Sequence, residues 1–286
     1  MSPHRSAPAC FPKPDFKGSF TMLIAHISDF HIMEDDRKTC DVVPAARQLG
    51  KLIAHINGLS PAPDLVLITG DLTHDGTLEQ AREARRILSD LRMPWYLVPG
   101  NHDRRDTLKK VFAPQACPSR DEDFLHFQID LPSLRLIGLD STRPDAPGGM
   151  LCPQRADWLE NRLDEEPEKP TLLFLHHPPT NFGVPETDRD GFEGAERLGE
   201  IIERHPCIKR ILCGHIHLNA STCWRGVLVN TAPSAAGMEL TLSPGTNTPS
   251  GFHLVDPAYL LHYLAPDGGL VTHQIQVRDN LATHAF

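Results

Sequence analysis

Short clusters of histidine, aspartate and asparagine recur along this chain, and each follows directly after an apolar run. The clearest cluster is Asn101, His102 and Asp103, which follows the run 94–97 and a Pro-Gly turn. Four further clusters complete the set: Asp29 with His31, Asp71, His176, and His215 with His217. Imidazole and carboxylate groups are the ligands that zinc, iron and manganese take in proteins. The residue types therefore indicate a metal site, provided that the five clusters meet in space.

Each cluster by itself could have an ordinary structural role. Asn101 and Asp103 are residue types that favour helix N-caps, so this turn could equally cap the next helix. The recurrence after five apolar runs favours a shared site, because none of these polar residues is needed to end a strand. One metal takes three or four protein ligands, and this set is larger. Two adjacent metals that share one carboxylate would use all of it.

The elements that must position these clusters follow from the apolar runs, which predict buried strands. On an extended segment the side chains at i and i+2 point the same way. Asp29 and His31 can therefore converge on one point, as can His215 and His217. In open α/β sheets, sites form just outside the carboxyl ends of the strands, and each cluster lies at such an end.

The hydrophobic pattern divides the rest of the chain into strands and helices. Buried or alternating runs predict strands at 21–27, 64–69, 94–97, 124–129, 134–139, 171–175, 208–213, 222–224, 226–230, 259–263 and 270–277. Helical spacing predicts helices at 41–58, with Asp41 as a cap, and at 77–92, 108–112, 153–163 and 195–205. Strands alternate with helices in the first half and dominate the end, so the sequence predicts a layered α/β sandwich with a partly mixed sheet.

Composition excludes several classes of protein. The net charge of −9 and the lack of a long basic run argue against binding to a nucleic-acid duplex. No apolar run approaches the roughly 20 residues that span a bilayer, so no membrane partner is expected. The seven cysteines form no CxxC pair and are odd in number, which favours reduced thiols in the cytoplasm.

The domain organisation is simple. Residues 1–20 hold four prolines and no apolar segment, which is typical of a flexible tail rather than a signal peptide. Residues 21–286 then form one domain. The stretch 232–257 is rich in Ser, Thr, Pro and Gly and is expected to be a cover loop or a small cap. Together with the loops 32–43 and 178–194, it would shape the substrate pocket.

The five clusters and their flanking residues resemble the motifs of the calcineurin-like metallophosphoesterases, over roughly residues 22–231. They occur in the same order: Asp29-Phe30-His31, Gly70-Asp71, Gly100-Asn101-His102-Asp103, His176, and Gly214-His215-Ile216-His217. The form of the last three is similar to that of the bacterial class III cyclic-nucleotide and glycerophosphodiester phosphodiesterases. The resemblance implies a four-layer α/β/β/α sandwich of two mixed sheets flanked by helices, the metallophosphoesterase fold.

The resemblance also implies the roles of the clustered residues. One metal would be held by Asp29, His31, Asp71 and His217, and the other by Asp71, Asn101, His176 and His215, so that Asp71 bridges. Asn101 and His102 would contact the substrate. His102 would act on the phosphate as a catalytic residue without binding metal, and Asp103 could orient it or cap a helix. His177 stays open as a second ligand or a pocket residue.

The implied activity is that of a dinuclear phosphodiesterase acting on small phosphodiesters such as 3′,5′-cyclic nucleotides. Two metals roughly 3.5–4 Å apart can share a water and present it as hydroxide to phosphorus. Iron, manganese and zinc all suit the ligands. A glycerophosphodiester phosphodiesterase, or a broad phosphomonoesterase, is the alternative. A non-catalytic scaffold on the same fold is a remote one. Relatives that act on glycerophosphodiesters use a cap to assemble, so a homo-oligomer is also considered.

Overall fold

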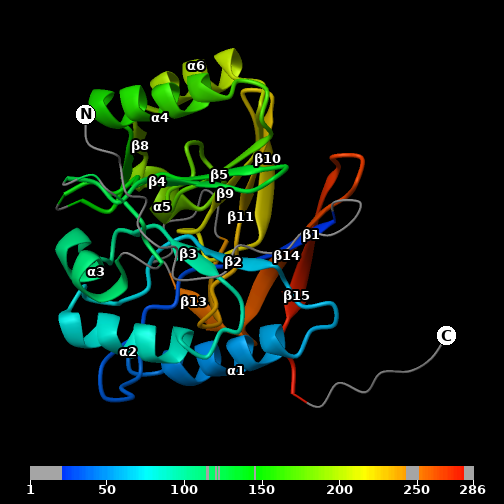
Figure 1. Ribbon diagram of the computed structural model, residues 1–286. Helices are drawn as coiled ribbons and strands as arrows, with labels where there is room; N and C mark the ends of the chain where they lie inside the picture. The colour runs from blue at the N-terminus through cyan, green and yellow to red at the C-terminus, as the bar shows by residue number, and fades with distance from the viewer. Residues whose placement is uncertain are drawn as a thin grey trace, which may run out of the picture.

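Two β-sheets lie face to face, and helices cover both outer faces (Figure 1). The computed structural model describes residues 21–113, 116–119, 121, 123–144, 146–242 and 251–279. The predicted tail at residues 1–20 lies outside this range. The four layers are those of the metallophosphoesterase fold, so the predicted α/β/β/α sandwich is confirmed. No helix in the described part of the chain is both long enough and apolar enough to cross a membrane.

The first sheet mixes parallel and antiparallel pairing. Its five strands run in the order β15 (Leu270–Gln276), β14 (Ala258–Leu264), β1 (Met22–Ile27), β2 (Leu65–Ile68) and β3 (Trp95–Leu97). Strands β1, β2 and β3 are parallel, whereas β14 is antiparallel to both of its neighbours. The carboxyl ends of β1, β2 and β3 therefore meet at one edge of the sheet.

The second sheet is built in a similar way. Its six strands run in the order β10 (Ala220–Trp224), β11 (Val227–Thr231), β9 (Ile208–Cys213), β7 (Thr171–Phe174), β5 (Arg135–Gly138) and β4 (Phe127–Asp130). Strands β11, β9, β7 and β5 are parallel, and the two edge strands are antiparallel. The predicted mixed pairing is thus found in both sheets.

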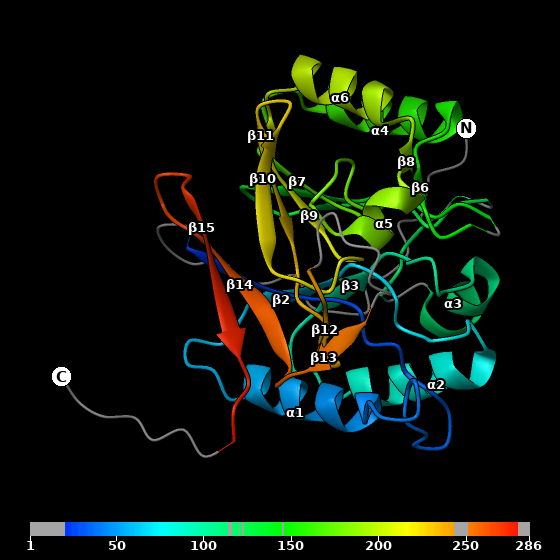
Figure 2. The same ribbon diagram turned by 180° about the vertical axis from the view of Figure 1, so that it is seen from behind.

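The helices flank the sheets in two groups (Figure 2). Helices α1 (Ala45–Asn57), α2 (Leu78–Leu88) and α3 (Arg105–Phe112) pack beside the first sheet. Helices α4 (Pro153–Glu165) and α6 (Ala195–Arg204) cover the outer face of the second sheet. A short helix and two small strand pairs complete the described part: α5 (Pro185–Asp190), β6 (Gly149–Met150) with β8 (Phe192–Glu193), and β12 (Met238–Leu240) with β13 (Phe252–Leu254).

Successive residues of the second sheet pack into two different hydrophobic cores, one on each face of the sheet. Leu172 and Phe174 of β7 belong to the core between the two sheets. Leu173, which lies between them in the sequence, packs with Leu159 of α4 and Ile201 of α6. Successive side chains of a strand point to opposite faces, so a strand covered on both sides is apolar throughout. This explains why the sequence shows continuous apolar runs instead of alternation.

Four predicted boundaries differ from the structure by three or four residues. The strand expected at 124–129 begins only at Phe127, because the amide of Leu125 donates to the Asp140 carboxylate instead of to a strand. Helix α1 begins at Ala45 after Pro44, while Asp41 lies in the preceding turn and is not its cap. Helix α2 ends at Leu88, and α3 begins earlier than predicted, at Arg105.

Two predicted loops contain structure of their own. Residues 178–194 include α5 and β8, and residues 232–257 include β12 and β13 on either side of the undescribed positions 243–250. The first part of the second loop packs against the predicted metal ligands, since Ser234 Oγ donates to the carbonyl of Asp29. Its assignment as a cover loop or cap stays a prediction.

Candidate metal centre

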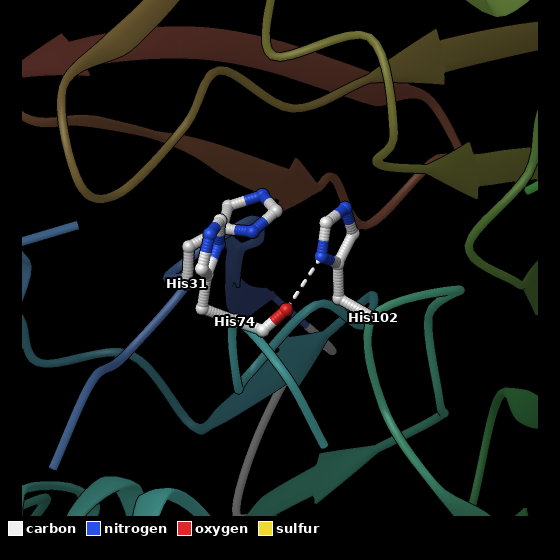
Figure 3. A group of neighbouring side chains, drawn as sticks. All are labelled: His31, His74 and His102. Carbon is white, nitrogen blue, oxygen red and sulfur yellow. Dashed lines mark hydrogen bonds between the residues drawn. The ribbon is translucent and has the colours of Figure 1, made fainter. Parts of the chain in front are cut away.

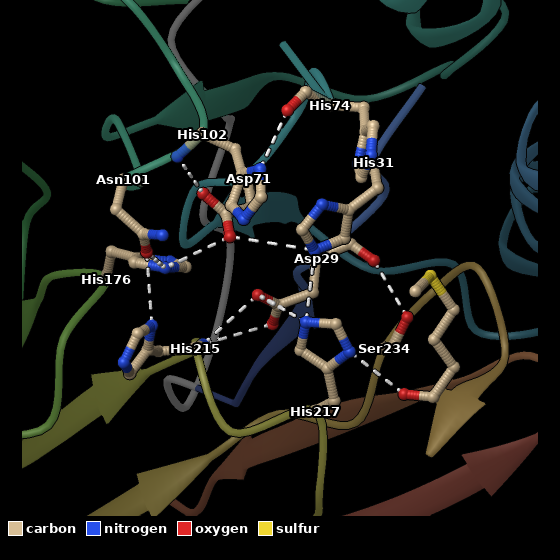
Figure 4. Close-up of polar contacts among 12 residues, drawn as sticks. Asp29, His31, Asp71, His74, Asn101, His102, His176, His215, His217 and Ser234 are labelled. Carbon is tan, nitrogen blue, oxygen red and sulfur yellow. Dashed lines mark hydrogen bonds and ion pairs between the residues drawn. The ribbon is translucent and has the colours of Figure 1, made fainter. Parts of the chain in front are cut away.

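All seven predicted ligands meet between the carboxyl ends of five strands, as Figure 4 shows. The first sheet supplies the residues that follow β1, β2 and β3, and the second sheet supplies those that follow β7 and β9. Contacts across the site join residues far apart in the chain, such as His31 and His217, whose Nε2 atoms are 3.0 Å apart. The structure thus brings together every strand-end cluster that the sequence singled out.

The first group of side chains consists of Asp29, His31, Asp71 and His217. Their donor atoms all lie within 4.8 Å of one another, and all four residues are buried. His217 Nε2 lies 3.6 Å from the Asp29 carboxylate, and His31 Nε2 lies 3.6 Å from Asp71 Oδ2. Two carboxylates and two imidazoles around one point are a suitable set for a transition metal.

The second group consists of Asn101, His176 and His215, next to the same oxygen of Asp71. Asn101 Oδ1 lies 3.0 Å from His176 Nε2 and 3.1 Å from His215 Nδ1. His176 Nε2 lies 3.4 Å from Asp71 Oδ2. Asp71 Oδ2 therefore faces both groups, which is the position required of a bridging carboxylate oxygen.

The other oxygen of this carboxylate is already occupied. Asp71 Oδ1 accepts a hydrogen bond of 2.9 Å from the backbone N–H of His102. This bond fixes the orientation of the carboxylate and leaves Oδ2 directed between the two groups. The backbone of the Asn101–His102 turn thereby sets the geometry of the Asp71 side chain.

The ring orientations test whether metal ions fit this site. His217 Nδ1 donates to the carbonyl of Met238 at 2.9 Å, and His176 Nδ1 donates to the carbonyl of Thr69 at 2.6 Å. In the neutral form of each ring, Nε2 then carries a lone pair that points at other acceptors: in His217 at the Asp29 carboxylate, and in His176 at Asp71. Converging lone pairs need a cation between them. Metal-bound histidines characteristically donate their second N–H in this way.

The electrostatics of the site show the same need for positive charge. Burial disfavours an imidazolium, yet the Asp71 carboxylate raises the pKa of His176 to about 9. Burial alone would raise the pKa of Asp71, but His176 and His102 hold it well below its usual value. Burial lowers the pKa of His215 to about 3, which keeps that ring neutral and able to act as a ligand. A bound metal would supply the charge that these carboxylates otherwise take from a proton.

The backbone at the site is unusual. Five of the predicted ligands have positive φ, a region that residues other than glycine seldom adopt: Asp29 (57°), His31 (49°), Asp71 (51°), His215 (72°) and His217 (57°). Such conformations cost about 1–3 kcal/mol each and persist where the surroundings hold them. They turn the chain sharply after β1, β2 and β9, so that these side chains point to a common centre.

Glycine allows the loops to approach one another closely. A Cβ on Gly100 would collide with the carboxylate and the amide of Asp71, and a Cβ on Gly214 would collide with Ser28 Oγ. The two glycines therefore precede ligand residues for a steric reason. They let the turns after β3 and β9 pack onto the turns after β2 and β1.

His102 lies next to the predicted ligand His31 and next to His74 (Figure 3). Its Nδ1 donates to the carbonyl of His74 at 2.7 Å, and its ring packs edge-on against His31, with the centroids 4.6 Å apart. The His74 ring stacks on His102 at 5.4 Å. Among the described residues, no hydrogen bond engages His102 Nε2. The sequence predicts His74 only at the surface or pocket rim, because no spacing indicates its place beside His102.

Asp103 contacts the backbone and not the His102 ring. Its carboxylate accepts from the amides of Gly100, Leu72 and Thr73 and from the hydroxyl of Thr73. Asp103 also does not cap α3, whose N-cap residue is Arg104. The carboxylate instead joins the turns after β2 and β3. Asp103 therefore positions the turn that carries His102 and does not contact the ring.

His177 is held by two other groups. Its Nδ1 lies 2.9 Å from Ser141 Oγ, and its Nε2 donates to the carbonyl of Pro147 at 2.9 Å. Although its ring lies near His176 and His215, both of its nitrogens are occupied by protein groups. These contacts favour the second of the two roles left open for His177, that of a residue supporting the pocket wall.

Two pockets are lined in part by residues of the site. The larger, with a volume of about 800 Å³, includes Asn101 and His102 in its wall. The smaller, of about 170 Å³, includes His177 and His215 and lies against the α5 loop. A substrate bound at the metal ligands can therefore extend in either direction.

Comparison with known proteins agrees with this geometry. The family model described as calcineurin-like phosphoesterase matches residues 22–219. A protein of Arcobacter nitrofigilis named "Probable glycerophosphodiester phosphodiesterase GpdQ" is 34% identical over 253 residues, which cover 88% of this chain and 92% of that protein. The 3′,5′-cyclic adenosine monophosphate phosphodiesterase CpdA of Pseudomonas aeruginosa is 27% identical over 281 residues, which cover 98% of this chain and 96% of CpdA.

A solved structure supports the fold. The dimetal phosphatase from Danio rerio superposes with a TM-score of 0.63 at 13% sequence identity, covering 90% of this chain and 99% of that one. At this level of identity the likeness concerns the arrangement of strands and helices alone.

Proposed function

This chain belongs to the calcineurin-like phosphoesterase family, and we propose that it hydrolyses small phosphodiesters, such as 3′,5′-cyclic nucleotides, at a centre of two metal ions. One observation carries the proposal: a single oxygen, Asp71 Oδ2, lies between three further predicted ligands on one side and three on the other. Relatives that span most of the chain are named as phosphodiesterases, which supports diesters as the substrates.

Asp29, His31, Asp71 and His217 would hold one metal, and Asp71, Asn101, His176 and His215 the other. Iron, manganese and zinc all accept this nitrogen and oxygen set, so metal availability would decide among them. When bound, such a pair lowers the pKa of a water and neutralises charge on the phosphoryl oxygens.

His102 is the proposed catalytic residue beside the metals. Because its Nδ1 is bound to the His74 carbonyl, its Nε2 is the atom that reaches the substrate. There it can donate a hydrogen bond to a phosphoryl oxygen or a proton to the departing alkoxide. Asn101 would contact the substrate through its amide, and Asp103 would position the turn that carries both residues.

Glycerophosphodiesters are the second candidate substrates, because the relative at 34% identity carries that name. The same site and the same chemistry would serve both classes. The choice between them depends on the pockets and not on the metal ligands.

The cellular setting is also a proposal. Six of the seven cysteines lie in the described part of the chain, and all six are free thiols. Free thiols support a reducing compartment such as the cytoplasm.

The test is a panel of esters assayed with metal-stripped protein and with protein reloaded with Fe²⁺, Mn²⁺ or Zn²⁺. The substrates are bis-p-nitrophenyl phosphate, p-nitrophenyl phosphate, 3′,5′-cyclic AMP and glycerophosphocholine. We expect diesters to be cleaved faster than the monoester, only after reloading, and not by Asp71→Ala. Asp157→Ala, which removes an exposed carboxylate on α4, is the matched control and should keep full activity. Two bound metals without cleavage of any ester would favour the scaffold instead.

A further inference from the structure

The larger pocket has a wall of mixed charge beside the metal ligands. Asn101 and His102 form its inner end, so a phosphate bound there has a substituent directed into this space. The rest of the wall is contributed by His74, by the start of α3 and by the loop after β5. Which of these charges is free to bind a substrate follows from their partners.

Most charged groups of this wall already have firm partners. Asp103 accepts hydrogen bonds from backbone amides, and Asp75 accepts from the Gln80 amide at 2.9 Å. The guanidinium of Arg105 lies 2.6 Å from the buried Asp140 carboxylate, which neutralises it. Asp106 has only an exposed pair with Lys110 at 3.4 Å, which is worth little.

Arg104 differs from its neighbours. It is exposed at the N-terminus of α3, and within the described residues its guanidinium has neither a hydrogen-bond nor an ion-pair partner. Its aliphatic stem lies against Gly76, where a Cβ would collide with the Arg104 Cγ. Because Gly76 has no side chain, the stem of Arg104 can pack against it at the pocket wall.

A second arginine adds to the positive charge. Arg143 lies in the same wall and has only one carboxylate near it among the described residues, that of Glu193 at 3.7 Å, with both side chains largely exposed. An exposed pair of this kind is worth little and leaves the guanidinium open to a ligand. Arg104 and Arg143 thus give this pocket two exposed guanidinium groups in a chain whose net charge is −9.

The smaller pocket differs from the larger one in the charges of its wall. Its described wall holds no lysine or arginine, and the carboxylate of its Asp188 accepts from the amides of Phe182 and Gly183. The two substituents of a diester would therefore meet different surroundings. Only the one on the His102 side would meet unpaired positive charge.

We infer that the pocket beside His102 binds a second anionic group, carried by one substituent of the phosphodiester, and that Arg104 is the residue that selects it. The inference rests on the proposed function, because it assumes that the scissile phosphate occupies the metal centre. The preferred substrates would be small diesters that bear an additional phosphate or carboxylate. Guanidinium groups bind both of these anions through paired N–H donors.

Two matched pairs of substrates test this with the metal-loaded protein. Glycerophosphoserine differs from glycerophosphoethanolamine by one carboxylate, and the linear dinucleotide pApA differs from ApA by one terminal phosphate. We expect kcat/KM to be about tenfold higher for the anionic member of at least one pair, as for a charge-assisted hydrogen bond in a partly open pocket. The pair that responds identifies the anion as a carboxylate or a phosphate.

The variants assign the preference to a residue. Arg104→Gln should reduce the ratio within the responding pair to about one, and Arg104→Glu should favour the member without the extra anion. Arg143→Gln should reduce the ratio less, because Glu193 already offsets part of its charge. Arg82→Gln, which removes an exposed arginine on α2 outside the pocket, is the control and should keep the wild-type ratio.

The outcomes separate this inference from the proposed function. Equal rates for both members of both pairs would overturn the inference and leave the phosphodiesterase assignment intact. A preference that persists in both Arg104 variants would overturn the role of Arg104. If the metal-loaded wild type cleaves no diester, including bis-p-nitrophenyl phosphate, the proposed function itself fails.

Discussion

Two clusters of buried histidines in the described part of the chain differ in their partners, and only one of them has the features of a metal site. At the strand ends, His176 and His217 direct lone pairs at carboxylates and at other acceptors. In the first sheet, His26 of β1 and His262 of β14 are equally buried but have no carboxylate of a described residue within hydrogen-bonding distance. Residue type and burial are therefore not enough to identify a ligand.

The partners of the sheet histidines explain the difference. His26 Nε2 lies 2.9 Å from Thr69 Oγ1, His262 Nδ1 lies 2.9 Å from Thr272 Oγ1, and the two rings meet at 3.3 Å. One arrangement of protons satisfies all four nitrogens with both rings neutral. Buried polar groups are stable when they are paired in this way. This cluster needs no cation, whereas the strand-end cluster does.

The strongest test of this comparison places the same substitution in each cluster. His217→Ala should lower metal binding and reduce kcat/KM for bis-p-nitrophenyl phosphate by about 10³-fold or more, since the metals supply the nucleophile. His262→Ala should retain both metals and most of the activity. Metal analysis and steady-state kinetics on both variants provide the measurement. Loss of metal from His262→Ala would contradict the distinction between the two clusters.

A smaller effect is expected within the metal centre itself. Asn101→Ala removes a neutral ligand from the second group and leaves the first group complete. We expect the metal content to fall from two ions to about one at limiting metal, with activity restored in part by excess metal. Titration calorimetry of the stripped protein would show this. Asn219→Ala, at an exposed asparagine after β9, should bind two ions as the wild type does.

The sheet histidines should affect folding instead of catalysis. His262→Leu leaves His26 Nδ1 without its partner in the core, which costs about 1–3 kcal/mol of unfolding free energy. Changing His26 to Leu as well removes both partners and should recover part of this loss. Urea unfolding of the metal-stripped variants measures the effect. Equal stability of the single variant and the wild type would show that the contact between the rings contributes nothing.

The smallest effect is a dependence of stability on pH. Burial lowers the pKa of His26 to about 3 and that of His262 well below its usual value, so the folded state keeps both rings neutral. The unfolded chain takes up these protons below about pH 6.5. Stability should therefore fall as the pH drops from about 6.5, by about 1.4 kcal/mol per pH unit for each histidine.

The variant with both histidines changed to leucine isolates this effect. The ligand histidines titrate in the wild type and in the double variant alike, so their contribution cancels in the difference between the two. The wild type should lose stability faster than the double variant between about pH 7 and pH 5, the range in which an unfolded histidine titrates. Parallel curves would show that the two rings are not held neutral.

The sequence alone determined the fold class and the residues at the site. Continuous apolar runs predicted the inner strands, because strands buried on both faces are apolar throughout. Polar clusters after five of these runs contain all seven predicted ligands and His102, and the structure brings them together. Their roles as ligands and as a catalytic residue stay predictions. The ends of these strands can be predicted from the sequence because an apolar run changes to polar residues within a few positions.

Only the tertiary structure decided which of sixteen histidines face one another. The residues alone did not separate His176 from His177, and His176 was chosen by the family resemblance. The two rings differ in the groups that surround them, which come from Thr69, Asn101 and Pro147. The sequence also did not predict that the rings of His74 and His102 stack, or that Asp103 accepts hydrogen bonds from the amides of Leu72 and Thr73. These contacts depend on turns with positive φ and on loops packed across glycines. This geometry depends on contacts between segments that are distant in the chain, so no local sequence pattern predicts it.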